Sequence, residues 1–228
     1  MGMSDAPVIS VRGEVVLEAQ PELALLSVHV QSQEDERRTA LDRLVERNQH
    51  ALDLIRSYGA AVERVETGGL AISPVLRQRR REGEIRAYQG TAWIKVTVVD
   101  FTVLGELVTR LGDMERTFVH GPQWDLRRDS EVYARAARQA AQEAVARARS
   151  YAEALGARLT GLVELADSGL IRDNVRAATP MMAAPMAAET YGAVPPSEPE
   201  PIVLEPETQL VRSSVEARFT VTAPDLDG

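Results

Sequence analysis

The hydrophobic residues of this chain change their spacing several times along the sequence, and the order of those changes constrains the fold most. Two runs with strand-like spacing, Val8–Leu17 and Leu23–Val30, are separated only by a short segment that contains Pro21. Their proximity predicts a β-hairpin, and Gly13 inside the first run is interpreted as a β-bulge. A helical spacing then extends from about Glu34 to Tyr58. Its apolar side contains Leu41, Leu44, Val45, Ala51, Leu52 and Ile55.

Strand-like and helical segments continue to alternate irregularly toward the C-terminus. A short helix is predicted from an N-cap at Asp100 to about Gly112, and a long helix from a cap at Asp129 or Ser130 to Leu155. Thr67-Gly68-Gly69 is interpreted as a bulge within a strand. Further strands are predicted at Val65–Leu76, Ile85–Val99, Phe118–Leu126, Leu159–Leu165 and Leu210–Val221. The inner stripe of the long helix is mostly alanine, which predicts close packing on a sheet: Val132, Ala136, Ala140, Ala144, Ala148, Ala152 and Leu155.

The resulting order is β-β-α-β-β-α-β-α-β-loop-β. It lacks the strict strand–helix alternation of a doubly wound fold, so the predicted class is α+β. We expect a mixed or antiparallel sheet packed by two long helices and one short helix, in a single domain over residues 8–223. The last strand, Leu210–Val221, alternates apolar and polar residues and should pair inside the main sheet.

The segment of about residues 177–206 differs in composition from the rest of the chain. Seven of the twelve prolines lie between Pro180 and Pro206, together with Met181, Met182 and Met186. This composition predicts a long irregular loop. Because methionine adapts to irregular apolar surfaces, the loop could dock on a partner or a neighbouring subunit. A disordered linker is the alternative interpretation.

Composition excludes several classes of protein. The chain has no cysteine, which rules out disulfides, thiolate zinc sites, iron–sulfur clusters and cysteine nucleophiles. Its formal charge of −8 disfavours nucleic acid and anionic membranes as partners. No apolar stretch is long enough to predict a membrane span. Residues 1–7 lack the features of a signal peptide, so we expect a cytoplasmic protein, or an exported one if a leader has been removed.

Few residues occur in patterns that carry chemistry. His29, His50 and His120 are isolated in the sequence, so a metal site would require the fold to bring them together. The sequence contains no G-x-S-x-G elbow, Walker loop or G-x-G-x-x-G fingerprint. Most carboxylates fall on predicted helix faces, where solvation explains them. We therefore expect no enzyme activity, no cofactor and no bound metal.

One basic cluster lies in a polar connection that resembles an exposed hairpin tip. It consists of Arg77, Arg79, Arg80 and Arg81. As a nucleic-acid site, four phosphate contacts would give a slope of only about −3 to −4 in log affinity against log salt. No aromatic residues interleave the arginines to stack on bases. We predict a solvated tip, with contact to an anion or another subunit as the functional alternative, and no nucleic-acid partner.

Several local patterns, taken in their order along the chain, resemble the SIMPL-domain family. The resemblance extends from about Val8 to Val221. The last predicted strand completes it, and the other matching pieces are Ile9–Glu14, Pro21-Glu22, Val65–Thr67, Ile72–Pro74, Tyr88–Thr91, Val96–Asp100, Leu104-Gly105 and the end of the alanine-rich helix, Arg149–Gly156. The sequence departs from the family pattern in lacking an export signal and at Met114–His120.

The resemblance implies an α+β domain without an established enzyme activity. Family members are often exported in bacteria, some build ring-like or channel-like homo-oligomers, and a role in oxidative-stress defence has been proposed. We therefore expect a self-assembling, homo-oligomeric protein whose contacts include Ala177–Pro206. The alternative is a module that binds a small molecule or peptide in a pocket near Trp93 or Trp124.

Overall fold

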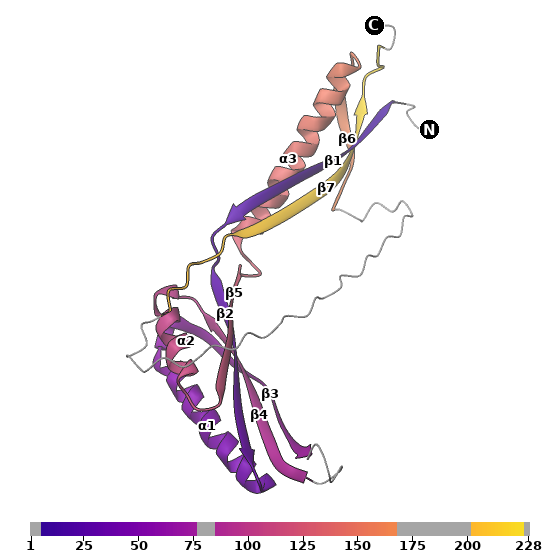
Figure 1. The fold of residues 1–228 in the computed structure, drawn as a ribbon. Coiled ribbons are helices and arrows are strands. Elements are labelled where there is room, and N and C mark those ends of the chain that lie inside the picture. The colour runs from indigo at the N-terminus through magenta and orange to yellow at the C-terminus, as the bar shows by residue number, and fades with distance from the viewer. Residues whose placement is uncertain (1–5, 77–84, 168–201, 226–228) are drawn as a thin grey trace, which may run out of the picture. The chain divides into compact units, whose positions relative to one another are not determined.

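The computed structural model describes residues 6–76, 85–167 and 202–225. These residues form two antiparallel sheets and three α-helices, which confirms the α+β class and the predicted order of elements (Figure 1). The chain divides into two compact units. The first unit contains β1, α3, β6 and β7, and the second contains β2 to β5, α1 and α2. The predicted single domain over residues 8–223 stays a prediction.

The second unit is a four-stranded sheet with two helices. Its strand order is β3-β4-β2-β5, and all neighbours run antiparallel. The strands are β2 (Leu23–Glu34), β3 (Val62–Leu76), β4 (Ile85–Val98) and β5 (Thr117–Asp125), and the helices are α1 (Arg37–Ser57) and α2 (Leu104–Gly112). The pairing of β3 with β4 shifts register between Thr67 and Gly69, which confirms the predicted bulge. Asp100 caps the short 3-10 turn Phe101–Val103 that leads into α2.

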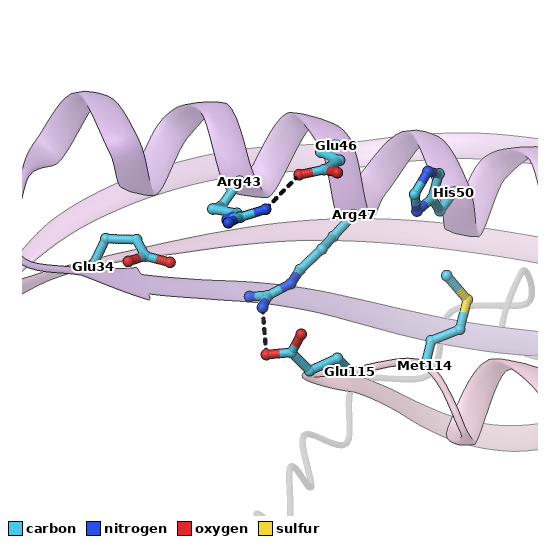
Figure 2. A pocket seen from close by; sticks show the side chains of 7 residues that line it. All are labelled: Glu34, Arg43, Glu46, Arg47, His50, Met114 and Glu115. Atoms are coloured by element: carbon cyan, nitrogen blue, oxygen red, sulfur yellow. Dashed lines mark hydrogen bonds and ion pairs between the residues drawn. The ribbon is translucent and has the colours of Figure 1, made fainter.

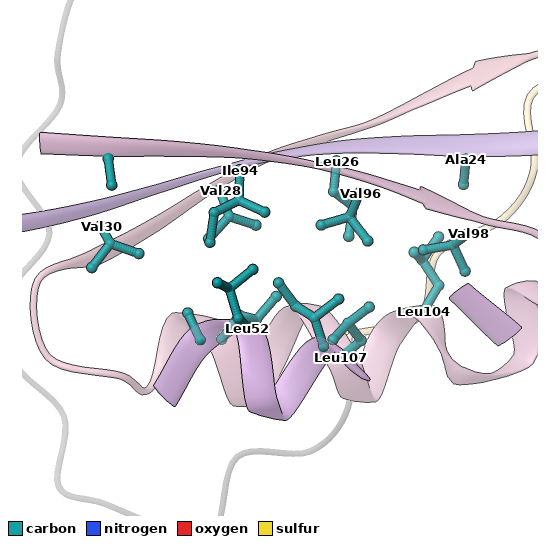
Figure 3. Packing of buried hydrophobic residues seen from close by; sticks show 14 of the residues in the cluster. Ala24, Leu26, Val28, Val30, Leu52, Ile94, Val96, Val98, Leu104 and Leu107 are labelled. Atoms are coloured by element: carbon teal, nitrogen blue, oxygen red, sulfur yellow. The ribbon is translucent and has the colours of Figure 1, made fainter. Parts of the chain in front are cut away.

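The core of the second unit lies between one face of this sheet and the two helices. In β2, residues at two-residue spacing point toward the helices, because successive side chains of a strand lie on opposite faces. Figure 3 shows this layer, in which sheet residues face Leu52 of α1 and Leu104 and Leu107 of α2. The sheet contributes Ala24, Leu26, Val28, Val30, Ile94, Val96 and Val98. The alternate residues of the same strands therefore form the opposite face, which we call the open face.

The first unit is a three-stranded sheet with one long helix. Its elements are β1 (Val8–Ala19), α3 (Glu131–Ala154), β6 (Leu159–Asp167) and β7 (Gln209–Val221). The strand order is β1-β7-β6. The N–H of Val221 donates to the carbonyl oxygen of Pro7 at 2.9 Å, so the end of β7 lies beside the start of β1. The last strand was predicted inside the main sheet, and it is instead the central strand of the smaller sheet, separate from the larger one.

The predicted hairpin between the first two strands is wrong. β1 and β2 are adjacent in sequence but belong to different sheets. Both edges of β2 are already occupied, by β4 on one side and β5 on the other, which leaves no edge for β1. The backbone at Glu22 supports this arrangement, since its N–H donates to the carbonyl oxygen of Asp125 at 2.9 Å.

α3 packs closely on β1 through a stripe of small residues, as predicted. Five alanines at four-residue spacing are buried, and Gly13 of β1 lies against them. A Cβ atom added at Gly13 would lie only 2.0 Å from the carbonyl oxygen of Ala140 and 2.6 Å from the amide nitrogen of Ala144. Gly13 therefore permits the close approach of helix and strand, and its interpretation as a bulge stays a prediction. Leu155 was predicted in the stripe but is 40% exposed just beyond the helix end.

Candidate functional site

The residues singled out from the sequence as possible contact sites lie outside the described part of the chain. They are Arg77, Arg79, Arg80, Arg81, Met181, Met182 and Met186. Of the predicted loop at residues 177–206, the structure describes only residues 202–206, which form no helix or strand. In this short piece Leu204 packs partly buried against the core of the second unit. The proposed contacts of the arginines and methionines stay predictions.

A polar pocket of about 480 Å³ lies beside α1 in the second unit (Figure 2). It is lined by Glu34, Arg43, Glu46, Arg47, His50, Met114 and Glu115. Arg43 donates to Glu46 at 3.0 Å, and Arg47 forms an ion pair with Glu115. Arg47 also donates to the carbonyl oxygen of Gln31 at 3.0 Å. Because both guanidinium groups are engaged by carboxylates of the same pocket, we assign it no substrate and no reaction.

A second pocket, of about 470 Å³, is mainly apolar and lies between the start of α1 and β3. It is lined by Arg37, Arg38, Leu41, Leu70 and Ile72. Neither of these two pockets is lined by Trp93 or Trp124, the positions expected from the sequence. The Trp124 ring instead packs edge-to-face on Phe101, with ring centroids 4.9 Å apart, at the border of the core.

Three ring side chains meet on the open face of the four-stranded sheet. His29 of β2 is paired in register with Trp93 of β4, and their ring centroids are 6.3 Å apart at an interplanar angle of 76°. On the other side, the His29 ring centroid lies 5.0 Å from that of His120 in β5. Burial, and in second place the neighbouring His120, lower the pKa of His29. Sequence reasoning treated these histidines as isolated, because only strand pairing brings them together.

Over the described ranges, no three or more His, Cys, Asp or Glu side chains are grouped in a way that could hold a metal ion. None of the helices in those ranges is both long enough and apolar enough to cross a membrane.

The outer strand of the smaller sheet exposes apolar residues. In β6, Leu162, Val163 and Leu165 are 58%, 52% and 50% exposed. Leu162 lies opposite Phe219 of β7 and Leu165 opposite Ala217, both of which are buried in the core under α3. The two leucines therefore lie on the helix side of the sheet, but α3 packs mainly on β1 and leaves them uncovered by the described residues. We call these three residues the β6 strip.

A known family matches a stretch of this chain that extends over the helices and strands described above. A family described as "SIMPL: Protein of unknown function (DUF541)" matches residues 9–219. The chain belongs to the SIMPL family. The resemblance inferred from the sequence patterns is thereby confirmed, and the match runs through elements of both compact units.

Two curated relatives give the SIMPL chain a context. They are the 26 kDa periplasmic immunogenic proteins of Brucella melitensis biotype 1 and Brucella abortus strain S19. Each is 26% identical over 166 residues, which cover 70% of this chain and 66% of the relative. The matched region therefore spans just under two thirds of the length of these relatives.

The expected cytoplasmic location is wrong. Both relatives are periplasmic by name, which contradicts it. The expectation rested on the residues at the N-terminus alone.

Proposed function

We propose that this SIMPL protein is exported and non-enzymatic, and that it assembles with copies of itself through the free edge of β6. One observation carries the proposal. Among the described residues, β6 is an edge strand in which Leu162, Val163 and Leu165 are half exposed or more. A row of unpaired backbone N–H and C=O groups is a template for another strand, and natural proteins usually protect such edges with charges or proline.

The charges on β6 do not protect its edge strongly. Glu164 is the only charged residue in the middle of the strand, and it faces Arg218 of β7 with an N–O distance of 3.7 Å. Its charge is therefore partly compensated within the unit. Thr160, the residue after Leu159, also makes its side-chain contact within the sheet. Its hydroxyl forms a hydrogen bond with that of Thr220 in β7 at 2.8 Å.

The β6 sequence also permits antiparallel pairing with its own copy. If two β6 strands paired about Val163, Glu164 and Asp167 of one copy would lie at the level of Leu162 and Leu159 of the other, so no two like charges would lie at the same level across the strands. The register shift between Leu162 and Glu164 places these two side chains on opposite faces of the sheet. Like charges directly opposite are destabilising, and their absence removes one common barrier to self-pairing. The six residues of two strips would then be withdrawn from water together.

The test is to replace both leucines, Leu162→Glu with Leu165→Glu, in the full chain. We expect the intact protein to run as one large species in size-exclusion chromatography with light scattering, and the double variant to run as a monomer. The two introduced carboxylates would remove the apolar contact of both leucines and would lose hydration in the assembly. Leu70→Glu is the matched control, because Leu70 of β3 is similarly exposed, at 54%, and should leave assembly unchanged.

The outcomes separate two claims. A strictly monomeric intact protein at micromolar concentration would reject self-assembly altogether. A double variant that keeps the size of the intact protein would reject the β6 edge but not self-assembly.

The predicted role of the loop is tested separately by deleting residues 179–198 and joining the ends with a short Gly/Ser linker. The deletion should shrink the assembly without unfolding the chain. A role in stress defence rests on the family resemblance alone and is likewise a proposal.

The second candidate function is binding of a small apolar molecule. The observation that favours it is the apolar pocket of about 470 Å³ between α1 and β3, because ligand pockets commonly measure about 300–1,000 Å³. An apolar fluorescent probe such as anilinonaphthalene sulfonate should bind the folded protein and gain fluorescence. Leu70→Glu places a carboxylate in the lining and should abolish most of that gain. Equal probe fluorescence in both proteins would reject the pocket as a binding site.

A further inference from the structure

We propose that His29 and His120 form a two-imidazole site for a divalent transition-metal ion on the open face of the four-stranded sheet. The two residues come from β2 and β5, strands that pair antiparallel at this point. The inference is independent of self-assembly through β6, which concerns the other unit. The ion would be exchangeable, with water filling the coordination positions that the protein leaves open.

Strand register explains why the two side chains converge. His29 lies opposite Phe118 of β5, and Ser27, two residues earlier in β2, lies opposite His120. His29 and His120 are therefore diagonal neighbours on one face of the sheet, at a separation that long side chains can bridge. Each is placed by antiparallel strand pairing, and the ladder shifts register just beyond the Ser27–His120 pair, between Leu25 and Ser27.

The distance between the rings fits shared coordination. A metal ion bound to an imidazole nitrogen at about 2.0–2.1 Å lies about 3.2 Å from that ring's centroid. Two rings that hold one ion with an N–metal–N angle of about 90–109° would then have centroids about 4.5–5.2 Å apart. The His29 and His120 centroids are 5.0 Å apart, within this range. Their planes are tilted by 55°, so the rings are not stacked on each other.

Two imidazole nitrogens define the class of ion that the pair would take. The neutral imidazole is the form that binds a metal. Charged residues on the neighbouring strands of this face include Glu66 and Lys95, which lie opposite each other in β3 and β4, and Arg64, which lies opposite Thr97. A site with two nitrogen ligands and no thiolate suits Cu²⁺, Ni²⁺ or Zn²⁺, and Cu²⁺ binds most tightly in this series.

The experiment is a titration of the tag-free full chain with Cu²⁺ at pH 7. Trp93 packs edge-on against His29, so a paramagnetic ion bound there should quench its fluorescence. We expect quenching that saturates at one Cu²⁺ per chain, and an electron paramagnetic resonance spectrum with coupling to two imidazole nitrogens. His120→Gln should weaken binding at least about tenfold, because even residues that only support a metal ligand are worth 10–100-fold in affinity.

Matched variants make each outcome decisive. His50→Gln removes the third histidine, which lies on α1 in the polar pocket, and should leave Cu²⁺ affinity unchanged. Trp93→Phe should remove most of the quenching but keep the resonance spectrum. His29→Gln repeats the test from β2, and circular dichroism checks that each variant is folded. Unchanged Cu²⁺ affinity in folded His120→Gln, or an equal loss in His50→Gln, would overturn the proposal. The monomeric β6 double variant should bind Cu²⁺ like the intact protein.

Discussion

Gly13→Ala is expected to lower the free energy of unfolding of the first unit by about 3 kcal/mol, at the upper end of the usual cost of overpacking. The added methyl group would lie 2.0 Å from the carbonyl oxygen of Ala140 and 2.6 Å from the amide nitrogen of Ala144. Both atoms belong to the backbone of α3, so no side-chain rotation can relieve the contact. The helix as a whole would have to move away from β1, which loosens the alanine stripe along its length.

Chemical denaturation followed by two probes measures this effect. Both tryptophans, Trp93 and Trp124, lie in the second unit, so their fluorescence follows that unit. Far-UV circular dichroism follows the helices of both units, α3 of the first together with α1 and α2 of the second. Gly13→Ala should therefore shift part of the dichroism change to lower denaturant and leave the fluorescence transition in place. Gly68→Ala is the control, because the nearest atoms to its added Cβ lie at 3.7 Å, and it should change stability little. Equal stability of Gly13→Ala and the intact chain would contradict the close approach.

Phe219→Ala is expected to cost about 3–5 kcal/mol, the range for removing a buried phenylalanine. Phe219 lies in β7, the central strand of the smaller sheet, and is 6% exposed in the cluster under α3. A sheet of three strands has few other large side chains to fill the cavity.

Removing residues 210–228 should have the largest effect on the stability of the first unit, because β1 and β6 both lose the strand that joins them.

Thermal unfolding followed by circular dichroism checks both changes. The truncated chain should lose the cooperative transition of the first unit, and Phe219→Ala should lower its midpoint. Phe118→Ala is the matched control, since Phe118 of β5 is 48% exposed and its removal should leave stability nearly unchanged. A truncated chain that melts at the midpoint of the intact protein would show that β7 is not needed for the fold.

Local pattern was enough to predict the elements of this protein. The period of the apolar residues identified the seven strands and three helices of the described chain to within a few residues. It also identified the alanine stripe of α3, because four-residue spacing on a helix places side chains on one side. The absence of cysteine and the order of short motifs were equally readable, since none of these features depends on which strands pair. Family membership followed from the same local patterns.

Only the tertiary structure decided which strands are neighbours. β1 and β2 follow each other directly and still enter different sheets, because β4 and β5 occupy both edges of β2. That competition for strand edges is non-local, and no spacing within either strand records it. The same pairing places β6 at an edge with its leucines uncovered, and it sets His29 beside His120. Both candidate sites therefore arise from contacts between residues distant in sequence, where a pattern along the chain carries no signal.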